Sequence, residues 1–126
     1  MIVVGIGTRR GVDVRDVLAA VHAALSMQPG GLAPAHLATA SFKRHEHGLI
    51  EAANQLRLPL VFVENAALEQ AATRAPHASV RVAALVGVAS VAEAAALAAA
   101  GPDSRLLLAR IVLGAVTCAI AEGTST

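Results

Sequence analysis

The sequence contains no tryptophan and no tyrosine, and only two phenylalanines among its 126 residues. Stacking of exposed nucleobases on aromatic side chains is therefore not an expected mode of binding for this chain. The formal net charge is only +1, from 10 Lys and Arg against 9 Asp and Glu. So small a net charge argues against a broad basic face for a nucleic-acid backbone. We therefore expect no nucleic-acid partner.

Cysteine and long apolar runs are also scarce. Cys118 is the single cysteine, which rules out an internal disulfide and suits a reducing compartment. The longest apolar stretch, residues 111–121, is far shorter than the roughly 20 residues that a transmembrane helix needs. The N-terminus lacks the basic flank and cleavage site of a signal peptide. We expect a cytoplasmic protein with no membrane segment.

Apolar residues are abundant, at 56% of the chain, and many of them are alanine. The length suits one domain with a proper core, so we expect a single domain over residues 1–126. Strand–helix alternation predicts a three-layer α/β/α domain whose mostly parallel sheet is closed by a C-terminal antiparallel hairpin. Hydrophobic periodicity predicts strands at residues 2–6, 37–42, 60–63, 105–110 and 115–121, and helices at residues 14–27, 49–56, 66–73 and 91–100.

The first predicted strand runs into a turn rich in glycine and arginine, and a helix start follows at Asp13, a good N-cap. In a parallel sheet this junction lies at the carboxyl end of a strand, where ligand crevices form and a helix start attracts anions. Adjacent arginines add forked donors suited to carboxylates or phosphates. The residues expected to hold an anionic ligand here are Gly5, Gly7, Thr8, Arg9, Arg10 and Gly11. The alternative is a tight turn with solvated arginines.

A nucleotide-binding turn is a further alternative. A dinucleotide fingerprint would place its third glycine at position 10, which is Arg10, and the glycine comes one residue later at Gly11. An arginine where the backbone must approach the helix closely argues against a dinucleotide site.

A second polar cluster, residues 43–48, follows the second predicted strand. Lys43 lies directly beyond the strand end, and we take Lys43 and Glu46 as candidates for polarising and proton-transfer roles. His45 and His47 would suit a metal on an extended backbone, but no third ligand stands nearby in the sequence. We therefore expect no metal site and no cofactor. The alternative for this cluster is a polar helix start at the surface.

Two later features bear on the site. Residues 90–93 form a capping box, in which Ser90 and Glu93 would each satisfy a backbone N–H of a helix start. Both are secondary candidates for ligand contact. Cys118 alternates with Val116 and Ile120 along one strand face, so we expect a buried thiol rather than a nucleophile.

Taken together, the motifs resemble the CobE family, which is also the C-terminal domain of CbiG. The matching segments, in the family's order and spacing, are residues 5–11 (GIGTRRG), 38–43 (ATASFK), 46–49 (EHGL), 86–97 (VGVASVAEAAAL) and 116–121 (VTCAIA). The resemblance covers nearly the whole chain and is to the stand-alone CobE form, since nothing upstream corresponds to the other CbiG domains. The chain departs from the family in the hairpin. There Arg110 replaces the usual lysine, and a shortened apolar connection follows.

This resemblance implies a three-layer α/β/α fold and a role in the corrin-ring stage of cobalamin biosynthesis. CbiG-type proteins open a lactone ring on a cobalt-precorrin and release a two-carbon aldehyde, whereas CobE-type proteins are suspected of binding or handing over a precorrin. The implied partners are a precorrin or corrinoid and other corrin-pathway enzymes, and whether this chain is an enzyme stays open. Precorrins carry acetate and propionate carboxylates at the ring edge. Arg9, Arg10 and Lys43 would pair with them.

Overall fold

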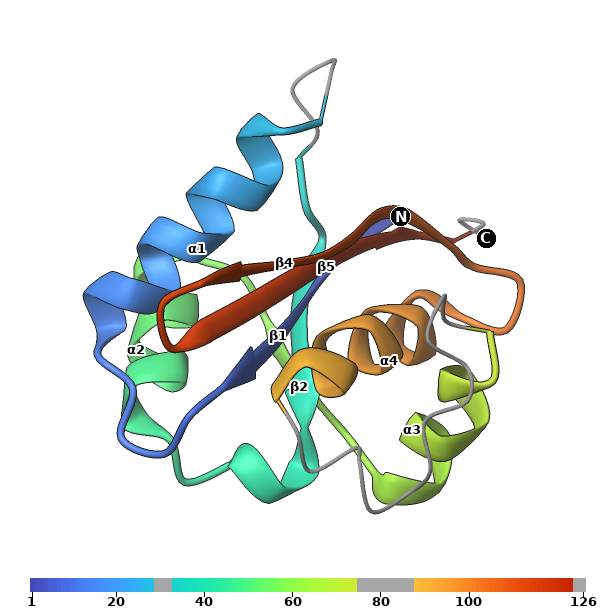
Figure 1. Ribbon diagram of the computed structural model, residues 1–126, viewed down its shortest axis with the longest axis horizontal. Coiled ribbons are helices and arrows are strands. Elements are labelled where there is room, and N and C mark those ends of the chain that lie inside the picture. Colours follow the sequence, from blue (N-terminus) through green and yellow to red (C-terminus); the bar gives the residue numbers. More distant parts are fainter. Residues whose placement is uncertain (29–32, 75–87, 124–126) are drawn as a thin grey trace.

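The computed structural model describes residues 1–28, 33–74 and 88–123, except the side chains of residues 88–90. A five-stranded sheet in the order β3-β2-β1-β5-β4 forms its middle layer (Figure 1). Its strands are β1 (Ile2–Thr8), β2 (His36–Ala40), β3 (Leu60–Val63), β4 (Arg105–Leu113) and β5 (Val116–Glu122). The β1–β2 and β2–β3 pairings are parallel, and the β1–β5 and β4–β5 pairings are antiparallel. The predicted closing hairpin is confirmed, and the sheet is evenly mixed rather than mostly parallel.

Helices cover both faces of the sheet, which confirms the three predicted layers. Helices α1 (Val14–Ser26) and α2 (His47–Leu56) lie on one face (Figure 1). Helices α3 (Asn65–Ala72) and α4 (Val88–Ala100) lie on the other. None of the described helices is long and apolar enough to cross a membrane.

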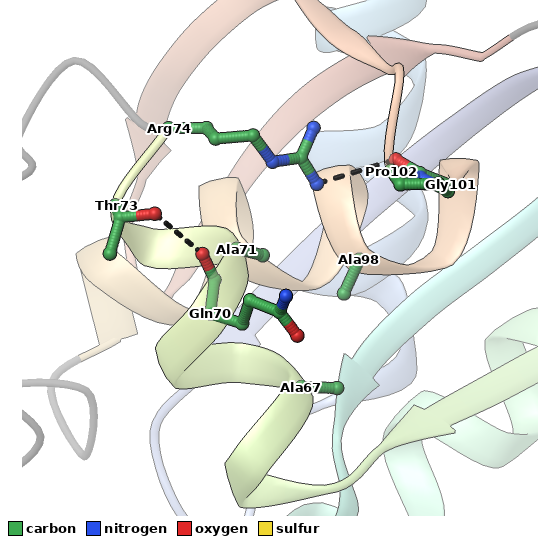
Figure 2. A pocket seen from close by; sticks show the side chains of 8 residues that line it. All are labelled: Ala67, Gln70, Ala71, Thr73, Arg74, Ala98, Gly101 and Pro102. Atoms are coloured by element: carbon green, nitrogen blue, oxygen red, sulfur yellow. Dashed lines mark hydrogen bonds between the residues drawn. The ribbon is translucent and has the colours of Figure 1, made fainter.

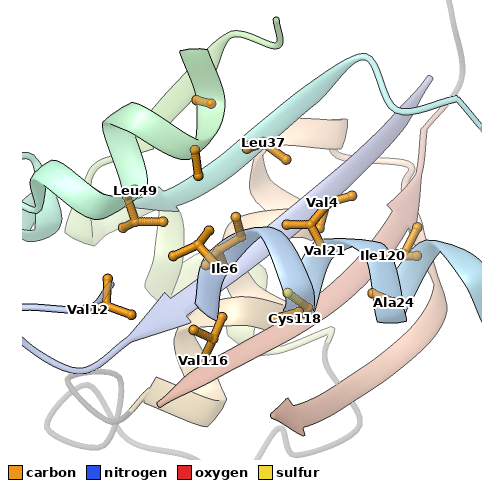
Figure 3. Close-up of a cluster of buried hydrophobic side chains, with 14 of the residues drawn as sticks. Val4, Ile6, Val12, Val21, Ala24, Leu37, Leu49, Val116, Cys118 and Ile120 are labelled. Atoms are coloured by element: carbon orange, nitrogen blue, oxygen red, sulfur yellow. The ribbon is translucent and has the colours of Figure 1, made fainter. Parts of the chain in front are cut away.

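The alternation of side chains along the strands divides the core in two. On the α1 and α2 side, Val4 and Ile6 of β1 pack with Cys118 and other aliphatic side chains (Figure 3). Val3 points the other way, into a second core with α3 and α4 that is largely alanine. Small side chains let α4 approach β1 so closely that a Cβ on Gly5 would overlap the carbonyl oxygen of Ala92.

Several predicted boundaries are wrong. Strand β1 continues to Thr8, α2 already begins at His47, and β4 continues to Leu113, so the apolar connection expected after Arg110 is part of the strand. Strand β2 stops at Ala40, and Ser41–Lys43 form a 3₁₀ turn, η1, whose Ser41 hydroxyl donates to Glu64 at 3.3 Å. Helix α4 begins at Val88, so Ser90 lies inside the helix and is not its N-cap. Residues 86 and 87 of the fourth matching segment lie outside the described residues.

The predicted capping box is therefore absent, and Glu93 has another partner. Glu93 is 1% exposed, and its carboxylate accepts a hydrogen bond at 3.1 Å from the backbone N–H of Arg110. That N–H lies where β4 has two residues opposite one of β5, between the pairs Leu108–Ile120 and Ile111–Cys118. Such a bulge removes an N–H from the strand ladder, and Glu93 satisfies it.

Candidate functional site

The loops that follow β1 and η1 meet at the carboxyl end of the parallel strands. The backbone N–H of Gly11 donates to Oε1 of Glu46 at 2.8 Å, a contact between residues 35 apart in the sequence. Gly11 has φ 73°, a left-handed conformation that glycine adopts without steric penalty. The two polar clusters identified in the sequence are therefore neighbours in space.

Between these loops lies a hollow of about 380 Å³. It is lined by Arg10, Gly11, Val12, His45, Glu46, His47 and Gly48. Residues 10–12 belong to the loop before α1, and His47 and Gly48 are the first residues of α2, so the start of α2 borders the hollow. The positive end of the α2 dipole favours an anion in this position.

The start of α2 leaves two backbone donors open. Glu46 is the N-cap of α2, but its side chain makes no hydrogen bond to its own helix. Leu49 and Ile50 donate to the Glu46 carbonyl. Within the described part of the chain, the N–H groups of His47 and Gly48 donate to no acceptor. Both residues line the hollow, so unpaired donors border it together with Arg10.

Cations around the hollow differ in what they contact. Among the described residues, Arg9, Arg10 and Lys43 form no ion pair. Arg44 is engaged, since its guanidinium lies 3.3 Å from Oε1 of Glu64 and also donates to the Ser41 carbonyl. Arg10 alone of these four belongs to the lining as described. Arg9 and Lys43 are therefore available charges outside the hollow itself.

The other expected ligand residues lie elsewhere. Gly5, Gly7 and Thr8 are buried in β1, where the Thr8 hydroxyl has no hydrogen-bond partner among the described residues. Arg9 fixes the chain through its backbone, because its N–H donates to the Ala115 carbonyl at 3.1 Å. Glu93 bonds the bulge in β4, and the side chain of Ser90 is outside the described residues. The structure thus brings together Arg10, Gly11 and Glu46 of the candidates.

Val12 is a lining residue that the sequence analysis missed, and Gly48 was placed there only as the last residue of the polar cluster. A Cβ on Gly48 would overlap the Val12 carbonyl oxygen, so the two loops touch through their backbones. A glycine inside a helical pattern is a signal for such a close approach, and Gly48 carried it.

Metal-ligating side chains and the cysteine thiol are the other groups that could form a site. In the described part of the chain, no group of three or more His, Cys, Asp or Glu is placed to hold a metal ion. Cys118 is buried as predicted, and burial raises the pKa of its thiol to about 12. A thiol with so high a pKa is almost entirely protonated at neutral pH and is a poor nucleophile.

A second hollow, of about 360 Å³, lies between α3 and α4 (Figure 2). Its one cation, among the lining residues described, is Arg74, which points at the end of α4 (Figure 2). The guanidinium donates to the Ser104 carbonyl at 3.0 Å and to the Gly101 carbonyl at 3.3 Å. It also donates to the Leu97 carbonyl in the last turn of α4 at 3.4 Å, so Arg74 links the C-terminus of this helix to the loop that follows it.

Comparison with known proteins assigns the family. The family model described as "Cobalamin synthesis G C-terminus" matches residues 2–121. Protein CobE of Sinorhizobium sp. is 33% identical over 123 residues, which are 95% of this chain and 79% of that protein.

Two solved structures have the same fold. The cobalamin biosynthesis protein chiG from Agrobacterium tumefaciens is 41% identical, with a TM-score of 0.79 over 99% of this chain and 100% of that one. The crystal structure of CobE, a protein from the cobalamin (vitamin B12) biosynthetic pathway, is 34% identical, with a TM-score of 0.83 over 96% of this chain and 92% of that one. The chain therefore belongs to the CobE and CbiG C-terminal family of cobalamin biosynthesis proteins.

Proposed function

We propose that this chain binds a precorrin intermediate of cobalamin biosynthesis and hands it to another enzyme of the corrin pathway. The hollow between residues 10–12 and 45–48 grips carboxylates at the edge of the ring. The observation that carries the proposal is the presence of Arg10 and the unpaired N–H groups of His47 and Gly48 around one hollow. Family membership supplies the pathway.

The donors suit a carboxylate for two reasons. A guanidinium presents paired N–H groups that match both oxygens of a carboxylate. Free N–H groups at a helix start add directed donors and a favourable dipole. Each exposed ion pair contributes only about 0–1 kcal/mol, so a ligand with many carboxylates gains most from this arrangement. Arg9 and Lys43, without ion pairs among the described residues, are available to further carboxylates of the same ligand.

The size of the hollow indicates how much of the ligand it takes. At about 380 Å³ it lies near the lower end of the roughly 300–1,000 Å³ range of pockets for drug-sized molecules. A precorrin is larger than such molecules, so the hollow takes one edge of the ring and the remainder lies outside. Val112 and Leu113, which are 66% and 43% exposed at the hairpin tip, offer apolar surface. The backbone hydrogen bond from Arg9 to Ala115 links this hairpin to the loop between β1 and α1, which contains Arg10.

Titration with uroporphyrin, a tetrapyrrole that carries acetate and propionate groups, tests the proposal. Arg10→Ala is expected to raise the dissociation constant up to about fivefold, which corresponds to roughly 1 kcal/mol for one exposed ion pair. Arg105→Ala is the control, because Arg105 pairs with Glu122 at the opposite end of the sheet. Equal affinities for the parent and Arg10→Ala would remove the hollow as the binding site.

A second candidate function is hydrolysis of a precorrin lactone with release of an aldehyde, as in CbiG-type proteins. It is favoured by the presence of Glu46, His45 and His47 in the lining, since carboxylates and imidazoles are common proton-transfer groups. Lys43 would polarise the substrate. Purified protein incubated with a cobalt-precorrin lactone should then release aldehyde, and Glu46→Gln should abolish the release. Bound ligand without any aldehyde would favour the carrier function.

A further inference from the structure

We propose that Glu46 is an internal stand-in for a carboxylate of the ligand. Its side chain accepts a hydrogen bond from the N–H of Gly11. A ligand carboxylate displaces the Glu46 side chain and accepts the hydrogen bond from Gly11 in its place. This inference rests on the proposed function, because it requires a carboxylate ligand in the hollow between residues 10–12 and 45–48. It adds a specific exchange at one hydrogen-bond donor.

Glu46 does not perform the ordinary task of an N-cap. N-cap side chains accept hydrogen bonds from the first turn of their own helix, and Asp, Asn, Ser and Thr are preferred because they are short enough. The Glu46 side chain makes no such bond and reaches across to Gly11 instead. As a result, a carboxylate already lies beside the unpaired N–H groups of His47 and Gly48.

Gly11 presents its N–H to a space that a ligand can enter. The residue is exposed, and a Cβ built on it would meet no atom within 4 Å. Its hydrogen bond to Glu46 is itself exposed, so water can replace either partner without leaving a buried polar group. The bond is therefore easily broken and remade.

The Glu46 carboxylate and a ligand carboxylate cannot both accept from the Gly11 N–H without a cost in free energy, because two negative charges at this distance repel each other. A ligand carboxylate that bonds Gly11 must therefore move Glu46 aside. Once displaced, the Glu46 carboxylate shares the hollow with the guanidinium of Arg10, which has no ion pair among the described residues. The exchange costs binding free energy, and a ligand with several carboxylates recovers that cost at its other contacts.

The proposal predicts that removal of Glu46 tightens binding. If Glu46 only stabilised the loops or took part in catalysis, its removal would not tighten binding. Removing Glu46 should tighten binding of a polycarboxylate, because the donor is vacant and the repelling charge is gone. Glu46→Ala is expected to lower the dissociation constant of uroporphyrin about tenfold. Glu46→Gln should lower it less, because its amide oxygen still accepts from Gly11 while the charge is absent. The methyl ester of uroporphyrin, which has no carboxylates, should bind all three proteins alike.

Glu51→Gln is the matched control. It removes the same charge from the same helix, and the exposed Glu51 side chain accepts a hydrogen bond from Gln55 and has no other partner among the described residues. This variant should leave the dissociation constant unchanged. Thermal unfolding of each variant reports whether the loops still close, and Glu46→Gln carries the test should Glu46→Ala not fold.

Unchanged or weaker uroporphyrin binding by folded Glu46→Gln would overturn the stand-in. So would equal tightening by Glu46→Gln and Glu51→Gln, which would reflect overall charge. Failure of the proposed function looks different, since Arg10→Ala would then bind uroporphyrin as tightly as the parent protein.

Discussion

Gly48, in the first turn of α2, lies against Val12 so closely that a Cβ on Gly48 would overlap the Val12 carbonyl oxygen. The same hypothetical atom would lie 3.3 Å from a methyl group of Val12. Backbone contact at this point sets the spacing of the two loops, and the Gly11–Glu46 hydrogen bond adds a second link between them. The width of the hollow therefore depends on residue 48 being a glycine, which has no Cβ.

Replacing Gly48 with alanine should destabilise the protein, although alanine is the better helix former by about 1 kcal/mol. The nearest atom is backbone, which cannot rotate away, so the overlap should cost about 1–3 kcal/mol. Urea unfolding would measure the change, and uroporphyrin affinity should fall as the loops separate. The exposed residue Asn54, near the other end of α2, is a control, since Asn54→Ala should be neutral or slightly stabilising. A more stable Gly48→Ala protein would contradict the close contact.

A second glycine sets the distance between α4 and the sheet. Gly5→Ala should lower the free energy of unfolding by about 3 kcal/mol or more, because the added Cβ would overlap the Ala92 carbonyl and lie 2.7 Å from the Ala96 nitrogen. Shrinking the neighbouring side chain with Ala96→Gly should not restore stability, since the obstructing atoms belong to the backbone. Rescue in the double variant, measured by urea unfolding, would show that side chains rather than backbone set the spacing.

The fold was largely predictable because most elements carry a local signal. Helix α1 has an Asp13 cap, confirmed by its bond to the Arg15 N–H at 2.8 Å, and an apolar stripe. The hairpin has Gly114 at its turn, with φ 62°. Two of the misplaced boundaries lacked a reliable signal, since the capping-box pattern at residues 90–93 lies inside α4. The end of β2 depends on a contact between Ser41 and Glu64 from a different element, and α4 is apolar on nearly every side, so its start has no periodic mark.

The convergence of the two loops around the candidate site was predictable, but the residues that line the hollow were not. Carboxyl ends of neighbouring parallel strands meet at one edge of a sheet, so the two polar clusters could be expected to converge. Of the two adjacent arginines, Arg10 lines the hollow. This depends on the path of the chain through Gly11, and the neighbouring residues do not predict the left-handed φ of Gly11. The Gly11–Glu46 bond is likewise a tertiary contact that spacing alone does not reveal.

Arg74 should contribute to stability through the end of α4. Its guanidinium donates to the Leu97 carbonyl in the last turn of α4 and to the Gly101 carbonyl directly after the helix, and a cation at a helix C-terminus also interacts favourably with the dipole. Arg74→Met keeps most of the side-chain length and should lower the free energy of unfolding by about 1 kcal/mol, a value reduced by solvent exposure. Arg15→Met, which breaks only an exposed ion pair to Asp13 at 3.8 Å, should change it by much less. Equal effects of the two substitutions in urea unfolding would exclude a capping role.

Cys118 should make stability fall at high pH. Burial raises the pKa of its thiol to about 12 in the folded protein, against roughly 8.5 for an exposed thiol. The folded state then holds the proton more tightly than the unfolded state, so the stabilisation is complete below about pH 8.5 and is lost as pH rises toward 12. The slope from this group is at most about 1.4 kcal/mol per pH unit.

Urea unfolding at several pH values between about 8.5 and 12 would measure how the free energy of unfolding changes with pH. The part of this change that comes from the thiol should be absent in Cys118→Ala. The absence of tyrosine from the sequence simplifies the comparison, because no phenol titrates in the same range.

Labelling of Cys118 with iodoacetamide offers an independent measurement, since this reagent reacts with the thiolate. A buried thiol is reached only when the chain opens, so the folded protein should be labelled at its rate of opening. Rapid labelling at neutral pH without urea would show that solvent reaches Cys118 in the folded state, and the predicted slope would then have no basis.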